Sequence, residues 1–315
     1  MNVTHILQRG ARWWGVIALA TVLLKTTKEV GNKEILTHVQ DVLLVLVAIG
    51  LLILMLTTPI IIAISIRHLG TLRPFFVRPR LFARVLLAWL CTDIAGSVLF
   101  MEALRIGEFS IVGPLRNTGT LFSFVIGYYV LGQKISWRRK LAGSFIIVIG
   151  ALLLSGSQYS IHDALPAFLA MLAAALFAVT AMFERVAVDP VRGAGVPPSI
   201  FAYVGTAGEL VAYSLALYAL TGSVEPVVPV VERILSDGRL FLFVVVSGAL
   251  AYWLGVAALV HGELVQVSAV FRLGVLTTMF SGAIFFQEDI SDKIVGGLVL
   301  FAGVVFVALP SRTKK

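Results

Sequence analysis

The sequence has little charge and a single cysteine. Of its 315 residues only 13% are charged and 59% are hydrophobic, and the mean hydropathy is +0.97. A soluble domain carries about a quarter charged residues, so this composition excludes an ordinary soluble domain and predicts a membrane protein. The one cysteine, Cys91, excludes an intramolecular disulfide.

Motifs of the common catalytic and metal-binding classes are also missing. No GxxxxGK[ST] phosphate loop is present, which argues against direct ATP coupling within this chain. The five histidines are scattered and do not have the spacing of metal ligands. The hydrophobic runs show no period-2 alternation, which excludes barrel strands. We therefore expect no enzyme activity, no cofactor and no metal site.

What the sequence contains instead is a series of hydrophobic runs, most of them close to the about 20 residues that a helix needs to cross a bilayer. Ten runs occupy nearly the whole chain, at about 13–28, 42–66, 81–103, 109–131, 141–155, 165–185, 200–221, 240–260, 264–286 and 294–309. The first run lacks a signal-peptide cleavage site, so we expect it to be retained. The sequence thus predicts an all-α polytopic membrane protein with ten transmembrane helices.

The basic residues follow this topology. Most Lys and Arg side chains fall in the loops that lie on the same side as the two termini, which predicts cytoplasmic termini by the positive-inside bias. The net charge of +8 is then explained by loops that face anionic lipid, and we expect no nucleic-acid partner. The expected location is a prokaryotic cell membrane.

An internal repeat divides the chain. The segment that begins at Ala103 aligns without gaps to the segment that begins at Ala258, and both contain a Gly-Glu turn and an Ile-Ser pair. Each half carries five runs, and because five is odd, the second half enters the membrane inverted. We predict two five-helix repeats, residues 1–156 and 157–315, an arrangement typical of secondary transporters that work by alternating access.

Glycines at a spacing of seven follow each repeat segment. Gly143 and Gly150 in the first half match Gly296 and Gly303 in the second. Small residues at this spacing mark a helix face that a neighbour approaches closely. Packing within one chain is the preferred interpretation and a dimer seam is the alternative, so we expect a monomer or a homodimer.

Three segments carry a resemblance to a known family: EALRIGEFSIVGPL at 102–115, LGQKISWRRKLAGSFIIVIGALLL at 131–154 and FFQEDISDKIVGGLVLFAGVVF at 285–306. Together they resemble the drug/metabolite transporter superfamily, in its ten-helix members built from two EamA-type repeats. The sequence departs from the family pattern at Gln133, where Glu is common, and at Gln287, which replaces Gly. The resemblance implies transport without a cofactor, of substrates that range from amino acids, amines and drugs to nucleotide sugars and sugar phosphates.

Two arginines lie inside predicted spans, Arg116 in the fourth run and Arg272 in the ninth. An arginine near the centre of a span costs roughly 2.5–3.5 kcal/mol and needs a partner, a cavity or a ligand. Inverted topology puts the two on either side of the midplane, where bidentate guanidinium groups can bind an anionic group. The alternative is a structural pair with Asp93 or Glu209.

Further polar residues within the spans complete the predicted site. The expected substrate-binding set is Arg116, Arg272, Asn117, Thr118, Thr278 and Tyr203, and the expected coupling or gating set is Glu209, Asp93 and Lys25. Interhelical hydrogen bonding explains the threonines equally well. The alternative role for Lys25 is snorkelling, in which its ammonium group reaches the membrane interface.

These residues favour a secondary active transporter that moves a small organic metabolite across the lipid bilayer, with an anionic group bound by Arg116 and Arg272. The first alternative is a proton-coupled exporter of amino acids or cationic drugs in which Glu209 is the coupling residue. The second, from another class, is a non-transporting membrane partner or a channel.

Overall fold

The computed structural model describes residues 3–67, 78–116, 118–130, 132, 137–154, 161–189, 193–261, 267, 270–271 and 273–308. Across these ranges the regular structure is helical, without a strand. Five helical segments are long and apolar enough to cross a membrane: Val42–Ala63, Pro79–Ile106, Ala164–Val188, Pro198–Thr221 and Gly238–Leu259. Two shorter apolar helices are Ala142–Leu154 and Gly274–Phe286. The chain is a multi-pass helical membrane protein.

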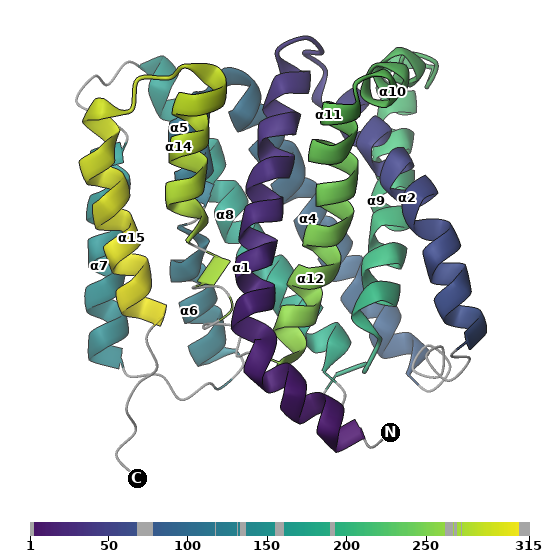
Figure 1. The fold of residues 1–315 in the computed structure, drawn as a ribbon, viewed down its shortest axis with the longest axis horizontal. Coiled ribbons are helices and arrows are strands. Elements are labelled where there is room, and N and C mark those ends of the chain that lie inside the picture. The colour runs from purple at the N-terminus through teal and green to yellow at the C-terminus, as the bar shows by residue number, and fades with distance from the viewer. Residues whose placement is uncertain are drawn as a thin grey trace.

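The helices run back and forth along one bundle (Figure 1). Those of the first half are α1 (Val3–Leu36), α2 (Val42–Arg67), α4 (Pro79–Ile106), α5 (Phe109–Arg116), α6 (Gly119–Tyr129) and α7 (Trp137–Leu154). Those of the second half are α8 (Ile161–Val188), α9 (Pro198–Thr221), α10 (Val227–Ser236), α11 (Gly238–Leu240), η2 (Phe241–Val246), α12 (Ser247–His261), α14 (Gly274–Phe286), η3 (Ser291–Lys293) and α15 (Ile294–Ala308). In Figure 1, α1 begins and α15 ends at the same end of the bundle.

The predicted continuous helix at 109–131 is wrong, because the structure has two helices there, α5 and α6. The break follows a tighter turn: the backbone N–H of Thr118 donates to the carbonyl of Leu115 at 3.0 Å, and its hydroxyl donates to the same carbonyl at 2.8 Å. An i to i−3 bond of this kind does not continue an α-helix. Arg116 therefore stands at the end of a helix rather than within one.

The first helix is longer than the sequence predicted. α1 continues to Leu36, well past the expected end at residue 28. Lys28 and Glu29 lower the local hydropathy, so the predicted run ends there. The helix continues because the side chains of both residues line a cavity inside the bundle. Glu29 and Asn32 are both buried.

An additional short helix, α10, covers one end of the bundle. Its buried residues Val227, Val230 and Ile234 share one face and pack toward α2, as expected for an amphipathic helix. The run predicted at 240–260 matches the span Gly238–Leu259, and within this span a π-helical segment, η2, lies between α11 and α12. π-Helical insertions of this kind are frequent at functional sites.

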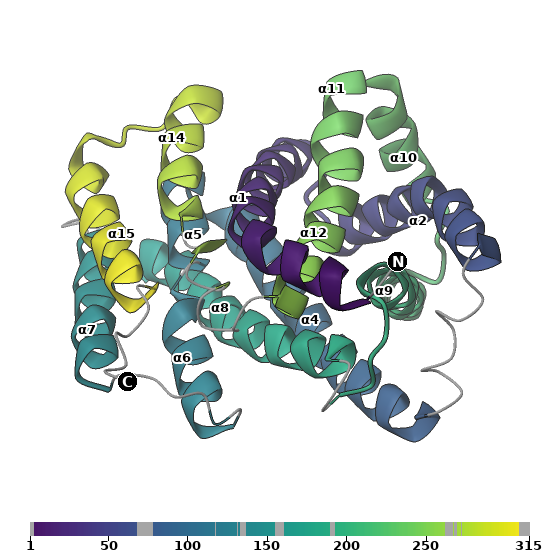
Figure 2. The same ribbon diagram turned by 60° about the horizontal axis from the view of Figure 1, so that its bottom comes forward.

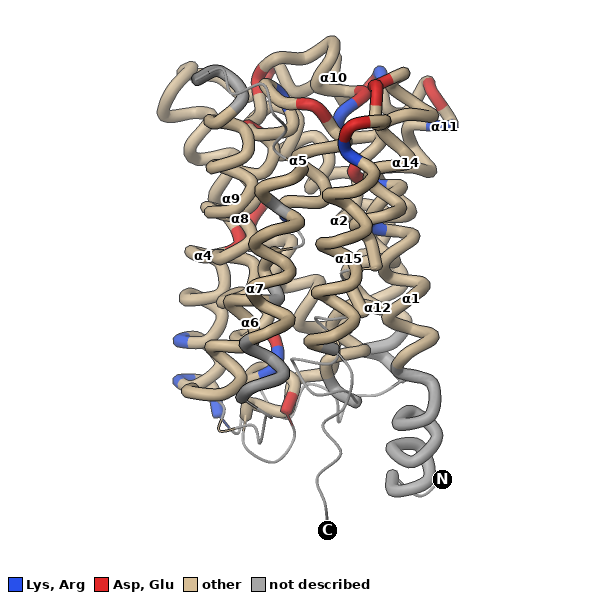
Figure 3. Tube along the Cα trace, turned by 90° about the vertical axis from the view of Figure 1, so that its left-hand side faces the viewer, with Lys and Arg blue, Asp and Glu red and all other residues tan. Residues whose placement is uncertain are grey.

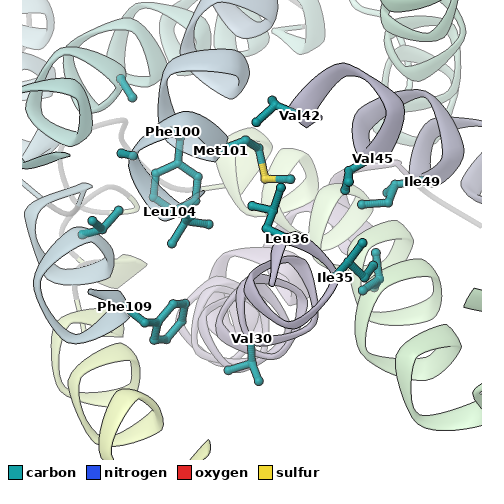
Figure 4. Packing of buried hydrophobic residues seen from close by; sticks show 14 of the residues in the cluster. Val30, Ile35, Leu36, Val42, Val45, Ile49, Phe100, Met101, Leu104 and Phe109 are labelled. Atoms are coloured by element: carbon teal, nitrogen blue, oxygen red, sulfur yellow. The ribbon is translucent and has the colours of Figure 1, made fainter. Parts of the chain in front are cut away.

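Apolar side chains from both halves of the chain form the main core, and Figure 4 labels those that α1, α2, α4 and α5 contribute. Phe100 and Leu104 of α4, Leu36 of α1 and Phe109 of α5 are all nearly or fully buried in it. The principal helix pairs are α4 with α8, α1 with α12, α2 with α9, α5 with α14 and α7 with α15. These pairs join segments that are far apart in the sequence.

The four spaced glycines pack α7 directly on α15. A Cβ atom built on Gly150 would lie 2.4 Å from the backbone nitrogen of Leu300, and one built on Gly296 would lie 2.6 Å from that of Leu154. Gly143 and Gly303 make the same kind of contact farther along the pair. The prediction that these glycines pack within one chain is confirmed.

The connection between α14 and α15 is clamped onto the start of α5. The two carboxylate oxygens of Glu288 accept hydrogen bonds from the backbone N–H groups of Phe109 and Ser110, both at 2.7 Å. Lys293 forms an ion pair with Glu108. A carboxylate at a helix N-terminus satisfies N–H groups that have no partner within the helix. The clamp thus ties the second half of the chain to the first.

Gln287 ends α14 in the left-handed conformation, with φ 55°. The aligned residue of the first half is Gly132, whose φ is 61°. Gln287 therefore has a backbone conformation that favours glycine. A left-handed non-glycine residue costs about 1–2 kcal/mol, partly offset by the greater flexibility of glycine in the unfolded chain.

We therefore expect Gln287→Gly to stabilise the protein by about 1 kcal/mol. Thermal unfolding in detergent measures the effect, and Gly132→Gln is the reciprocal variant, expected to destabilise. A lower unfolding temperature for Gln287→Gly would contradict the assignment of strain to this residue.

Candidate functional site: a central cavity with charged walls

A cavity of about 240 Å³ lies within the bundle and is lined by residues of α1, α2, α4, α5, α8, α9, α12 and α14. The helices α1, α4, α8 and α12 are central, between the α7–α15 pair at one edge and α2 at the other (Figures 1 and 2). Most charged positions gather near the ends of the bundle, and few lie at mid-height (Figure 3). The charged residues that line the cavity are Lys25, Lys28, Glu29, Asp93, Arg116, Glu184 and Glu209.

One face of α1 supplies four of the polar residues on the cavity wall. Lys25, Lys28, Glu29 and Asn32 are spaced i, i+3, i+4 and i+7, which places them on the same side of a helix. The Nδ2 atom of Asn32 donates to the sulfur of Met101 at 3.5 Å. This polar face is the reason that a charged stretch of α1 is accommodated inside the bundle.

Arg116 forms an ion pair with Glu29 across the cavity wall. Its guanidinium carbon also lies 4.4 Å from the ring centre of Phe100 and 4.7 Å from that of Phe177. The side chain of Glu29 is 8% exposed and that of Arg116 is 21% exposed. The guanidinium group is therefore held by one carboxylate and two aromatic faces, in the manner of a structural cation.

The two lysines of α1 lie on the same wall. The Nζ atom of Lys25 is 4.5 Å from the ring centre of Phe271. The aliphatic part of Lys28 passes over Gly248 of α12, where an added Cβ would lie 3.3 Å from its Cδ atom. A small residue at position 248 leaves room for the lysine stem to reach the cavity.

The opposite wall is acidic. Asp93 comes from α4, Glu184 from α8 and Glu209 from α9. The indole N–H of Trp89 donates to Glu184 at 3.3 Å. The cavity thus has a basic side on α1 and an acidic side on the three helices that face it.

Aromatic side chains support the acidic wall. The ring of Trp89 stacks on that of Tyr252, with 5.9 Å between their centres and an angle of 13°. A Cβ atom on Gly205 would lie 2.8 Å from the Trp89 ring and 2.9 Å from the Tyr252 hydroxyl. Gly205 is required here because any larger residue would displace this pair.

The structure brings together five of the residues predicted from the sequence. Arg116, Thr278, Glu209, Asp93 and Lys25 all line the cavity. The partner of Arg116 is Glu29, whereas the sequence suggested Asp93 or Glu209.

Two other predicted residues, Tyr203 and Thr118, do not join them, and two fall outside the described part of the chain. The hydroxyl of Tyr203 is hydrogen-bonded to that of Thr58 at 3.0 Å, away from the cavity lining. Thr118 is buried and bonded to its own helix end. Asn117 and Arg272 lie outside the described residues.

Sequence reasoning missed several residues of this cavity. It gave no site role to Lys28, Glu29, Asn32, Glu184 or Tyr252, all of which line it. The i, i+3, i+4, i+7 spacing on α1 was the available signal, and a hydropathy run that ended at residue 28 concealed it. Within the described ranges, no group of three His, Cys, Asp or Glu side chains is arranged to hold a metal ion.

Comparisons with known proteins support the fold. No family model matches the sequence, and no curated protein matches it. One solved structure, described as "Crystal structure of protein", aligns with 94% of this chain and 96% of its own chain, with a TM-score of 0.62. The identity is 14%, so this similarity concerns the fold alone.

Proposed function

We propose that this chain is a secondary active transporter that moves a small organic metabolite by alternating access, with the central cavity as its substrate site. The observation that carries the proposal is a cavity with charged walls deep inside a helical membrane protein. Charged groups within the membrane are costly and usually serve a substrate or ion pathway. The cavity is lined by four helices from residues 1–156 and four from residues 157–315, which suits rocking of one half against the other.

The helix pairing supports ten spans in two inverted EamA-like repeats. If the halves are exchanged, the pair α4–α8 becomes α12–α1, and the pair α6–α8 becomes α14–α1; all four contacts are present. The pairs α2–α9 and α7–α15 join equivalent helices. The common end at which α1 begins and α15 ends supports termini on one side, which we propose to be the cytoplasmic side of a prokaryotic cell membrane.

The proposed substrate carries an anionic group. Lys25 and Lys28 supply positive charge on one face of α1, at the cavity wall. We assign the anionic group to these two lysines first, because two cations one helical turn apart can contact the same anionic group, with Arg116 and its partner Glu29 shaping the wall beside them. Arg272 remains a proposed contact from the ninth run.

A proton-coupled exporter of amino acids or cationic drugs is the second candidate. The position of Glu209 on the cavity wall, which Asp93 and Glu184 also line, favours it. Such a carrier would use the acidic wall for the cationic part of its substrate.

The proposed site can be tested by thermal unfolding of the purified protein with anionic metabolites, amino acids and cationic amphiphiles. A ligand that binds only the folded state stabilises it by about 2.7 kcal/mol at a hundred times its dissociation constant. We expect anionic metabolites to stabilise the wild type, and Lys28→Gln to weaken their binding at least about tenfold, equivalent to 1.4 kcal/mol. The matched control is Arg105→Gln, an exposed cation at the end of α4.

Two outcomes would contradict the substrate assignment. Stabilisation that is unchanged in both Lys25→Gln and Lys28→Gln would move the anionic group away from α1. Stabilisation by cations alone would favour the second candidate. Counterflow of the stabilising compound in proteoliposomes then separates a carrier from a channel, since a channel shows no counter-transport.

A further inference from the structure

Three buried polar atoms of the cavity wall have no hydrogen-bond partner within the protein. They are the amide oxygen of Asn32 on α1 and the hydroxyl groups of Tyr213 on α9 and Tyr252 on α12. In the part of the chain that the structure describes, these are all the buried side-chain nitrogen and oxygen atoms without a partner, and all three residues line the cavity. Because nearly all buried polar atoms in proteins are hydrogen-bonded, three exceptions in one cavity point to a ligand.

Packing fixes each of the three side chains. The amide nitrogen of Asn32 donates to the sulfur of Met101 at 3.5 Å, which leaves the oxygen of this amide without a partner. The ring of Tyr252 stacks on that of Trp89, and the ring of Tyr213 belongs to the main apolar core. Helix α12 lies between α1 and α9 and packs against both (Figures 1 and 2). The three atoms therefore come from neighbouring helices around one space.

The chemistry of these atoms selects the kind of ligand group. An amide oxygen only accepts hydrogen bonds, whereas a tyrosine hydroxyl both donates and accepts. A ligand carboxylate cannot donate to the Asn32 oxygen, and a ligand ammonium group has three donors and no acceptor for the tyrosine O–H groups. A ligand hydroxyl group donates and accepts, so a ligand with several hydroxyl groups satisfies all three atoms.

We propose that Asn32, Tyr213 and Tyr252 bind hydroxyl groups of the substrate, and that the substrate is an organic anion with several hydroxyl groups. The inference rests on the proposed function, which assigns the anionic group to Lys25 and Lys28. Asn32 follows Lys28 by four residues on the same face of α1, about 6 Å farther along the helix. An anion bound at the lysines therefore reaches Asn32 with a hydroxyl group of the same molecule.

The test compares anions that share a carbon chain and differ in their hydroxyl groups. Gluconate and hexanoate form one pair, and glycerol 3-phosphate and propyl phosphate form the other. Thermal unfolding of the purified full-length protein, titrated with each anion, gives an apparent dissociation constant, because a ligand of the folded state raises its stability with concentration. We expect the hydroxylated member of at least one pair to bind about tenfold more tightly or better, since beside the other member the three atoms stay without partners.

Single variants then assign the preference to these residues. Tyr213→Phe and Tyr252→Phe remove only the hydroxyl groups, and each should weaken binding of the hydroxylated anion about fivefold, the effect of one hydrogen bond, without changing binding of its partner. Asn32→Leu should have the same effect on binding. The two Phe variants should unfold without ligand at the wild-type temperature or above it, because they lose no hydrogen bond within the protein. The matched control is Tyr203→Phe, whose hydroxyl is bonded to Thr58 away from the cavity lining; it should unfold at a lower temperature and keep the wild-type preference.

Three outcomes would overturn the inference. Equal affinity within both pairs, or binding of none of the four anions, would show that hydroxyl groups are not selected. Lower unfolding temperatures for both Phe variants, with an unchanged preference, would show that the hydroxyl groups are satisfied by buried structural water. Tighter binding of 6-aminohexanoate than of gluconate would assign the atoms to an amine. The proposed function survives each of these outcomes as long as some anion in the wider screen binds and Lys28→Gln weakens it; if no anion binds at all, both fail together.

Discussion

Arg116→Met is expected to destabilise the protein by about 3 kcal/mol, because it leaves the buried carboxylate of Glu29 without its partner. Removing one member of a buried ion pair costs about 3–5 kcal/mol, since the remaining charge has lost its solvation and its pair. The side chain of Arg116 is 21% exposed toward the cavity, so the lower end of this range applies. Glu29→Gln should also destabilise, because the guanidinium group then loses the charge-assisted bond to Glu29.

A double-mutant cycle isolates the pair. The variant that combines Glu29→Gln with Arg116→Met should recover most of the lost stability, giving an interaction energy of about 2 kcal/mol. The matched control is the exposed pair Glu102 and Arg105, for which Arg105→Met should cost less than about 1 kcal/mol. The free energy of unfolding of each variant, measured in mixed micelles, gives the interaction energy for both cycles, and the unfolding temperature gives the same ranking of variants.

An equally small effect for both arginines would contradict a structural role for Arg116. Arg116 would then be available to a substrate, as the sequence predicted. In that case Arg116→Met should reduce ligand affinity in the stability screen while leaving the unliganded protein intact.

Gly150→Ala is the substitution with the second large expected effect, a loss of about 2–3 kcal/mol. The added methyl group would lie 2.4 Å from the backbone nitrogen of Leu300, and backbone atoms of a packed helix cannot move aside as a flexible side chain can. The α7–α15 pair must separate, and overpacking of this kind typically costs about 1–3 kcal/mol. In a bilayer the close approach of helix backbones is itself a main source of association energy.

Gly15→Ala is the matched control. Gly15 lies within α1 and an added Cβ there meets no atom within 4 Å, so this substitution should stabilise by about 0.5–1 kcal/mol through helix propensity. Stabilisation by Gly150→Ala would contradict the packing argument. Light scattering should give the same oligomeric mass for Gly150→Ala and wild type, because these glycines pack within one chain.

Much of the fold could be predicted from the sequence, and the errors have physical causes. Hydropathy located the apolar helices, because burial in lipid depends on the composition of each segment taken alone. It misplaced the end of α1 and the break after Arg116, because a charge reduces hydropathy equally whether it faces lipid or a cavity. The sequence did not predict α10, because a helix of only 10 residues gives a weak hydropathy signal when hydropathy is averaged over the length of a membrane span.

The candidate site divides in the same way. Sequence alone singled out Arg116, Asp93, Glu209, Lys25 and Thr278 because polar residues in apolar helices are costly, and all five line the cavity. It could not choose their neighbours. Glu29 lies 87 residues from Arg116 in the chain, and the sequence around either residue does not indicate that the two are in contact.

The sequence by itself determined that this is a helical membrane protein with charges placed inside its bundle, since both follow from the free energy of transferring each residue into lipid. Only the tertiary structure decided which charges come together: Arg116 pairs with Glu29, and Asp93, Glu184 and Glu209 line one cavity. The reason is that transfer energies add residue by residue along the chain, whereas ion pairs and cavities depend on distances across helices that the packing of α1, α4, α5 and α9 sets.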